Sequence, residues 1–279
     1  MKHSAKLIGL CLILAACTSR QDQPAQVEPS YLLTATPVEL AASSPTLIPT
    51  PQETFIPTTE MPATLQLNHT PTLTLTPAGF KMCSPLAWET IPELFEIVSD
   101  PYKPPPVNRA EERHHGVDFS HYARKGRGSI EGEPVQAILA GKVAAAIHDR
   151  LPYGNMLIVE SGADIMPSEL AQAVGMAPNQ SLYVLYAHMK QSPQVQPGDL
   201  VTCGQVLGEV GASGYNVVNA HLHLETRLGP PGVRFPSMAF YTTTASVEEM
   251  ETYTRWRTGG EFKHFDPMIL FQEYLKLQR

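Results

Sequence analysis

Positive charge is in short supply in this sequence, and so are long apolar runs. Its 20 Lys and Arg are outnumbered by 27 Asp and Glu, which gives a formal net charge of −7. Nucleic acids and anionic lipid surfaces bind through clustered cations, so this balance disfavours both as the main partner. After residue 16 the chain has no run of about 18 apolar residues, and we therefore expect no transmembrane helix.

The first 16 residues have the pattern of a bacterial lipoprotein signal peptide. Lys2 and Lys6 form a short basic region, and residues 7–16 form an apolar run that is too short to span a bilayer. The run ends in Leu-Ala-Ala-Cys, which resembles a lipobox, so we expect cleavage before Cys17 and a lipid on its thiol. The alternative is an ordinary signal peptide with a chance cysteine. Both interpretations predict export, and the first predicts a protein held by its lipid to a membrane of the cell envelope.

Cysteine is scarce as well, with four residues in the chain. Cys11 would leave with the signal peptide and Cys17 would carry the lipid, so only Cys83 and Cys203 remain. An exported protein folds in an oxidising space, where an even pair of cysteines can form a disulfide. A bridge between Cys83 and Cys203 is therefore one interpretation, and two unrelated buried thiols are the other.

Residues 17–78 have the composition of a tether. Residues 34–77 contain 8 prolines and 12 threonines but no Lys or Arg. Repeated Thr-Pro steps interrupt helices and sheets, and too little apolar surface is present to offset the entropy cost of folding. We expect a disordered, partly polyproline-like linker, which at roughly 3 Å per residue could extend on the order of 100 Å from a membrane. Such reach suits a substrate away from the bilayer, although a spacer with no reach requirement has the same composition.

The folded part is expected to begin near Phe80, with an arm at 79–112, a core at 113–232 and a C-terminal extension at 233–279. The core contains short β-type runs separated by glycine turns. This spacing predicts a mainly β, antiparallel architecture. The runs are 135–143, 156–160, 181–188 and 201–210.

Helical patterns are confined to two places. Residues 162–180 have the character of an insertion that contains one short helix at 168–174. In the extension, Ser246 with Glu249 and Asp266 with Pro267 mark the starts of two further helices. We expect these C-terminal helices to pack on the sheet and to serve stability alone.

Two histidines stand two residues apart in the alternating run Asn219-Ala220-His221-Leu222-His223-Leu224-Glu225. A strand turns successive side chains to opposite faces, so His221 and His223 share one face while Leu222 and Leu224 point into a core. Two imidazoles side by side suit a metal, or a metal and the water it activates. Taken alone, the pattern is equally typical of two structural histidines on a strand.

A second candidate is His114 with Asp118, four residues apart. Gly116 and the following Val-Asp-Phe favour a turn that leads into a strand. An imidazole and a carboxylate that approach one point form a metal-ligand pattern, although a weak one by itself. His115 competes for the role, but the residue four positions after it is Phe119, which cannot bind a metal.

Together with Tyr186-Ala187-His188, these motifs resemble the M23 family of zinc metallopeptidases, of the lysostaphin and LytM type. The resemblance covers the stretch from Arg113 to Arg227. It rests on HHGVD, YGNMLIVE, YVLYAHM, PGDLVTCGQVLG and GASGYNVVNAHLHLETR. It implies an M23/LytM-like antiparallel β-sheet core and an enzyme that hydrolyses peptide bonds in peptidoglycan stems or cross-links.

The resemblance also implies a role for each polar position. His114, Asp118 and His223 would be the ligands of one Zn²⁺, which leaves a fourth position for water. His188 and His221 would flank that open position as the catalytic residues. When neutral they can orient or deprotonate the water, and when cationic they can stabilise the oxyanion or protonate the leaving amine.

The sequence departs from the family pattern in two places. The 162–180 insertion either reshapes the substrate groove or lies away from it, and Asn219-Ala220 replaces a common Gly-Pro or Ala-Pro pair. Five histidines match no family position and are expected to be structural or on the surface, with His121 close enough to Asp118 to support it. They are His69, His115, His121, His148 and His264.

Several hypotheses about function follow. The first is a lipid-anchored zinc endopeptidase of the cell wall, with a regulatory envelope protein as a further partner. The second is a catalytically silent scaffold of the same fold that binds cell wall or activates another hydrolase, although all five polar positions are present here. A third, a lipoyl- or biotin-carrier-like module, would need a carrier lysine that Lys190 matches poorly. The proline-rich arm 80–109 could also cover the groove in a resting form.

Overall fold

The computed structural model describes residues 80–111 and 113–279. The expected signal peptide, the lipidation site Cys17 and the 17–78 tether lie outside the described residues. In the described part of the chain, no helix is both long enough and apolar enough to cross a membrane.

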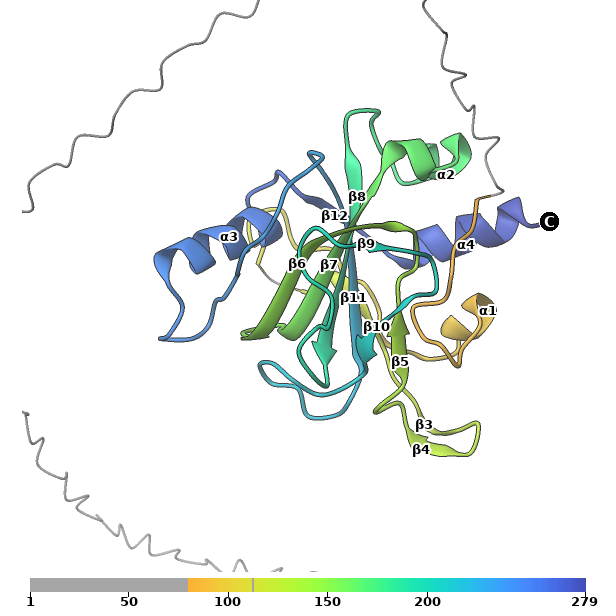
Figure 1. Cartoon of the computed structure of the whole chain (residues 1–279), viewed down its shortest axis with the longest axis horizontal. Helices are drawn as coiled ribbons and strands as arrows, with labels where there is room; N and C mark the ends of the chain where they lie inside the picture. Colours follow the sequence, from red (N-terminus) through yellow and green to blue (C-terminus); the bar gives the residue numbers. More distant parts are fainter. Residues whose placement is uncertain (1–79, 112) are drawn as a thin grey trace, which may run out of the picture. The chain divides into compact units, whose positions relative to one another are not determined.

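A single antiparallel sheet organises the fold (Figure 1). Within the described residues it has eight strands, ordered β1-β2-β11-β8-β7-β6-β9, with β12 pairing with β11. The strands are β1 (Val98–Asp100), β2 (Gly116–Phe119), β6 (Gly141–Arg150), β7 (Gly154–Gly162), β8 (Ser181–Met189), β9 (Leu200–Val201), β11 (Leu222–Gly229) and β12 (Lys263–Phe265). Two small two-stranded sheets join β3 (Tyr122–Arg124) to β4 (Arg127–Ser129) and β5 (Pro134–Gln136) to β10 (Val206–Glu209). The prediction of a mainly β, antiparallel fold is confirmed.

The sheet has an apolar core on each face, because β8 is buried on both sides. Alternate residues of β8 point to opposite faces of a strand. Leu182, Val184 and Tyr186 join one core, which also contains α1 (Ile91–Leu94) and α4 (Met268–Leu277). Tyr183, Leu185 and Ala187 join the other core, under α3 (Val247–Arg257). Burial on both faces explains why this strand is one continuous apolar run.

The three predicted helices are present. The 162–180 insertion forms η1 (Ala163–Ile165) and α2 (Ser168–Ala173), whose Leu170 enters the core shared with α4. Helix α3 begins with the expected capping box, in which Glu249 N–H donates to Ser246 Oγ over 3.2 Å and Ser246 N–H donates to Glu249 Oε2 over 3.0 Å. At α4, Asp266 Oδ1 accepts from the amide of Met268 over 2.9 Å.

Two of the expected strands are each divided into two strands in the structure, so their prediction as single strands is wrong. Residues 135–143 divide at 137–140, where the chain leaves β5 in the small sheet and enters β6 in the main sheet. Gly141 is the first residue of β6, and a Cβ there would lie 2.3 Å from the carbonyl of Glu160. Residues 201–210 divide in the same way into β9 and β10. Sequence periodicity could not separate these strands, since it does not reveal which neighbour each one pairs with.

The first part of the arm, residues 82–97, contributes side chains to the core. Its Cys83 N–H donates to Ile138 O over 2.9 Å, and Leu86 forms an isolated bridge with Val135. Leu86 and Leu94 are fully buried in the core on the α4 side. A disulfide joins Cys83 to Cys203, with 5.6 Å between the Cα atoms. Removal of residues 80–105 would therefore remove core side chains together with the arm.

Removal of this disulfide is expected to destabilise the folded domain. The bridge closes a loop of 120 residues, and restricting an unfolded loop of that length stabilises the native state by about 2–5 kcal/mol. The double variant Cys83→Ser/Cys203→Ser should lose that amount in urea unfolding followed by tryptophan fluorescence. A reductant should destabilise the wild-type chain and leave the double variant unchanged. Equal midpoints for wild type and variant would contradict the prediction.

Candidate metal centre

The pairing of β2 with β11 brings together two polar motifs that lie about a hundred residues apart in the sequence. His223 on β11 stands opposite Asp118 on β2, and Leu224 stands opposite Val117. Gly116 allows the strands to approach, because a Cβ there would lie 2.4 Å from the carbonyl of Leu224 and 3.0 Å from the His223 ring. The glycine of HHGVD is thus required by the close packing of β2 on β11.

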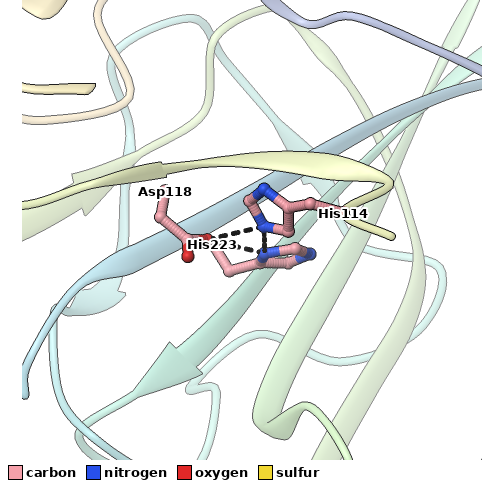
Figure 2. A group of neighbouring side chains, drawn as sticks. All are labelled: His114, Asp118 and His223. Carbon is pink, nitrogen blue, oxygen red and sulfur yellow. Dashed lines mark hydrogen bonds and ion pairs between the residues drawn. The ribbon is translucent and has the colours of Figure 1, made fainter. Parts of the chain in front are cut away.

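Three side chains converge at this pairing: His114, Asp118 and His223 (Figure 2). Asp118 Oδ1 lies 3.0 Å from His114 Nε2 and 2.8 Å from His223 Nδ1. The two imidazole nitrogens are 3.0 Å apart. Tetrahedral zinc with ligand distances of about 2.1 Å separates its ligand atoms by about 3.4 Å. The three donor atoms therefore form a triangle close to one face of such a site, and the donor set fits zinc.

The second nitrogen of each histidine ligand fixes which nitrogen is free for a metal. His114 Nδ1 lies 3.0 Å from the carbonyl of Pro101, which can only accept, so this nitrogen carries the proton. His223 Nε2 lies 3.1 Å from Oε1 of Glu225. Such acceptors behind metal-bound histidines set the tautomer and the ring orientation. His114 Nε2 and His223 Nδ1 are thereby left to face Asp118.

The charges around the cluster favour a cation. Burial by itself would raise the pKa of Asp118, but hydrogen bonds from His114 and His223 outweigh it and hold that pKa well below its ordinary value. Burial would lower the pKa of His223, yet Asp118 and Glu225 raise it to about 9. The two carboxylates that favour a proton on His223 equally favour a divalent ion between the ligands.

His188 and His221 lie beside the cluster, with their rings 4.7 Å apart. His188 Nδ1 donates to Ser213 O over 2.7 Å, and His221 Nδ1 donates to Asn219 O over 2.9 Å. In each ring Nδ1 is thus engaged with a backbone carbonyl, and Nε2 of His221 lies 3.6 Å from Asp118 Oδ2. Burial, followed by the charges of His223 and His221, lowers the pKa of His188 to about 3, so its ring is neutral at neutral pH. The structure brings together all five residues predicted from the motifs.

The Ser213-Gly214 loop shapes the position of His188. Gly214 has φ +107°, and a Cβ there would lie 2.9 Å from His188 Nδ1. The hydroxyl of Ser213 accepts from the amide of Asn155 over 3.0 Å and donates to Met189 O over 2.7 Å. This loop therefore supplies both the carbonyl that orients His188 and the space that its ring needs.

A hollow of about 210 Å³ adjoins the metal cluster, and some of the residues that line it were not predicted from the motifs. Tyr253 and Arg257 come from α3, so this C-terminal helix also lines the hollow beside the metal cluster. Glu111 is the one lining residue that precedes His114, and none of the lining residues belongs to the 162–180 insertion. The lining residues are Glu111, His114, Asp118, Pro152, Tyr153, His188, Tyr215, His223, Tyr241, Tyr253 and Arg257.

His121 does not support Asp118, contrary to expectation. Its Nε2 lies 3.7 Å from Glu133 Oε2, in a second buried cluster that also contains Glu89. The carboxylates of that cluster are already occupied by cations. Arg124 and Lys125 pair with Glu89 over 3.2 and 3.1 Å, and Arg127 pairs with Glu133 over 2.8 Å. We therefore interpret it as an ion-pair cluster that fixes the arm to the β3–β4 hairpin.

Three of the remaining histidines are structural, and His69 lies outside the described residues. Burial lowers the pKa of His115 to about 3 and that of His264 to about 4, and their neutral rings stack with centroids 4.5 Å apart. His148 Nδ1 lies 2.7 Å from Oδ1 of Asn155.

The arrangement defines the class of site. The Asp118 carboxylate and the imidazoles of His114 and His223 fit a metal ion. Next to them stand the imidazoles of His188 and His221, each held through Nδ1 by a backbone carbonyl. Residues 112–233, which contain all five side chains, match the family model of Peptidase family M23. This stretch of the chain is therefore similar to M23 peptidases. No curated protein sequence is significantly similar to the chain.

Several solved structures are similar to part of the chain. The catalytic domain of the prophage-encoded M23 protein EnpA from Enterococcus faecalis is 23% identical over 50% of this chain and 85% of its own, with a TM-score of 0.33. The catalytic domain of lysostaphin from Staphylococcus simulans is 26% identical over 50% and 86%, with a TM-score of 0.34. A zinc-containing peptidase from Vibrio cholerae is 24% identical over 47% of this chain and 33% of its own, with a TM-score of 0.32. These TM-scores are too low to carry an inference, so the family assignment rests on the sequence match.

The two histidines of the His-x-His pair should differ in their effect on zinc binding. His223→Ala removes one of the three donor atoms, so it should abolish stoichiometric zinc in protein purified at neutral pH. His221→Ala leaves the three donors intact and should retain close to one zinc per chain. Elemental analysis after dialysis measures both, with circular dichroism as the test of folding. Equal zinc content in the two folded variants would show that the ligand assignment is wrong.

Proposed function

We propose that the protein is a zinc endopeptidase that hydrolyses peptide bonds in peptidoglycan stems or cross-links. The observation that supports this most directly is the convergence of His114, Asp118 and His223 within one hollow that also contains His188. His221 completes the set through its ring contact with His188. The match to the M23 family model supports peptide bonds as the substrate class.

His114, Asp118 and His223 would hold the metal through Nε2, Oδ1 and Nδ1. When bound there, zinc supplies a Lewis acid for the scissile carbonyl and makes a water acidic enough to act as the nucleophile. The protein's contribution is to keep the three donors in one arrangement. The Pro101 carbonyl and the Glu225 carboxylate do this from behind the two imidazoles.

His188 and His221 would move the protons. Both rings have their Nδ1 proton committed to a backbone carbonyl, so neither can rotate without losing that hydrogen bond. The free Nε2 of a neutral ring can accept a proton from the attacking water and return it to the leaving amine. The resulting imidazolium can also stabilise the negative charge that develops on the carbonyl oxygen.

The N-terminal segment supports a place of action in the cell envelope. Under the proposal, Cys17 carries the lipid, the 17–78 tether provides reach toward the wall, and the membrane is contacted only through the lipid. A regulatory envelope protein remains a proposed partner. Lys190 pairs with Glu131 over 3.6 Å directly after β8, which gives no support to a carrier module.

The cleavage test uses purified peptidoglycan and mass spectrometry of the muropeptides. The zinc-loaded mature chain should release new free amines that identify the bond cut, and a chelator should prevent their appearance. His221→Ala should lose at least about 100-fold in rate, because it removes a proton-transfer group worth 10²–10⁴-fold.

The matched control for this test is Lys263→Ala, an exposed substitution on β12. It should cleave at the wild-type rate. A folded, zinc-loaded chain that sediments with the wall but creates no new ends would contradict the proposal and favour a silent scaffold.

A further inference from the structure

The guanidinium of Arg257 contacts groups that hold the two histidine ligands in place: Glu225, which contacts His223, and the backbone just before His114. Arg257 is the last residue of α3, and its side chain is only 12% exposed. Each of its three guanidinium nitrogens donates a hydrogen bond, either to Tyr153 and Glu225 in the core of the domain or to the segment before His114. Nε donates to Glu111 Oε1 (3.1 Å), Nη1 to Tyr153 Oη (3.4 Å) and Glu225 Oε1 (3.3 Å), and Nη2 to the carbonyls of Glu111 (3.4 Å) and Arg113 (3.3 Å).

On the His223 side, Arg257 acts through Glu225. The Glu225 carboxylate is completely buried, and its Oε1 accepts from His223 Nε2 over 3.1 Å and from Tyr153 Oη over 2.7 Å. A buried carboxylate is unfavourable unless all its oxygens are paired. Arg227 Nη2 lies 2.7 Å from Glu225 Oε2, and Arg257 Nη1 lies 3.3 Å from Glu225 Oε1, so both oxygens of the carboxylate that contacts the His223 ring are paired with cations.

Helix α3 contributes a second donor to the same carboxylate. Trp256 Nε1 donates to Glu225 Oε2 over 3.1 Å, and Arg227 donates to that oxygen from Nη2 over 2.7 Å. Two consecutive residues of α3, Trp256 and Arg257, thus hold one oxygen each of the group behind His223.

On the His114 side, Arg257 holds the backbone. The carbonyls of Glu111 and Arg113 accept from Nη2. Arg113 has φ +73°, a left-handed conformation that is unfavourable for a residue with a side chain and persists only where its surroundings enforce it. His114 follows directly, so the direction in which its side chain leaves the backbone depends on this fixed segment.

We propose that Arg257 is a positioning residue for the metal centre, assisted by Trp256. The Arg257 guanidinium fixes the backbone before His114 and the carboxylate behind His223. It thereby holds His114 Nε2 and His223 Nδ1 at a separation that suits metal binding. Both residues lie beyond residue 233, where the match to the family model ends. The C-terminal extension of this chain thus completes a centre whose ligands all lie in the M23 segment. This inference rests on the proposed zinc site but not on the proposed substrate.

An alternative role for Arg257, direct contact with a substrate in the hollow, is disfavoured by its hydrogen bonds. Its donors are already engaged with Glu111, Arg113, Tyr153 and Glu225. A lysine could not replace it, because a single ammonium cannot reach acceptors that lie on opposite sides of a planar fork.

The test measures zinc affinity on the full mature chain by competition with a chromophoric chelator. Loss of a group that supports a metal ligand typically weakens metal binding by about 10–100-fold. We expect Arg257→Lys and Arg257→Gln each to weaken zinc binding by at least about 10-fold. The visible spectrum of the cobalt-substituted protein should also change, because the ligand geometry is altered. Thermal unfolding of the metal-free forms identifies the folded fraction, to which each affinity is normalised.

The matched control is Arg255→Ala, which removes an arginine from the same helix. Arg255 pairs with Glu261 at the surface, with 2.6 Å from Nη2 to Oε1, and has no contact with the metal cluster. Its zinc affinity and cobalt spectrum should equal those of the wild type. Trp256→Phe keeps an aromatic ring and removes the hydrogen bond to Glu225, so it should weaken zinc binding by at least about threefold.

The outcomes separate the two proposals. Wild-type affinity and cobalt spectra in folded Arg257 variants would overturn the positioning role while leaving the zinc site intact. A wild-type chain that binds no zinc would instead overturn the zinc enzyme itself. If the Arg257 variants fail to fold, Trp256→Phe decides, and unchanged affinity in that variant overturns the inference.

Discussion

The antiparallel pairing of β2 with β11 is the constraint on which the rest of the structure depends. It places Asp118 opposite His223, and a shift of one residue would turn one of these side chains to the other face of the sheet. The pairing is tight enough to require glycine at position 116. Because β11 also pairs with β8, the same strand aligns the end of β8, where His188 stands, with the cluster. Strand register thus places Asp118 and His223 opposite each other, while the segment before β2 places His114.

One of the two clusters of buried charge in the described residues lies behind the metal ligands, and its charges are paired. Asp118, Glu225, Arg227 and Arg257 lie in contact with one another or with His223. Groups buried in this way are retained at a cost in desolvation, which only close pairing offsets. The gain is rigidity, since each imidazole has an acceptor that fixes its tautomer and orientation. A preorganised site of this kind needs little rearrangement when a metal or a substrate binds.

The segments that flank the stretch similar to M23 peptidases do more than extend it. The arm supplies core side chains and a disulfide partner, and the C-terminal extension supplies the helix that carries Arg257 and Trp256. Together these segments cover both faces of the sheet: the arm and α4 lie on one face, and α3 lies on the other. Through Glu111 and Arg257 the two segments also meet beside the metal ligands. The domain that would carry out catalysis is therefore stabilised and positioned by residues on both sides of it.

The sequence by itself determined the β architecture, the helix starts and the five polar residues of the site. The strands and helix starts depend on local rules, such as the alternation around His221 and His223 and the capping box at Ser246, whereas the five polar residues were assigned through the resemblance of short motifs to the M23 family. Only the tertiary structure decided the division of 135–143 into two strands, the place of His121 in a separate ion-pair cluster, and the role of α3. Glu111 and Arg257 lie 146 residues apart, and no local pattern marks either one. Such contacts arise because the sheet and its two cores fold distant segments onto each other, and side-chain periodicity records burial but not the identity of the partner.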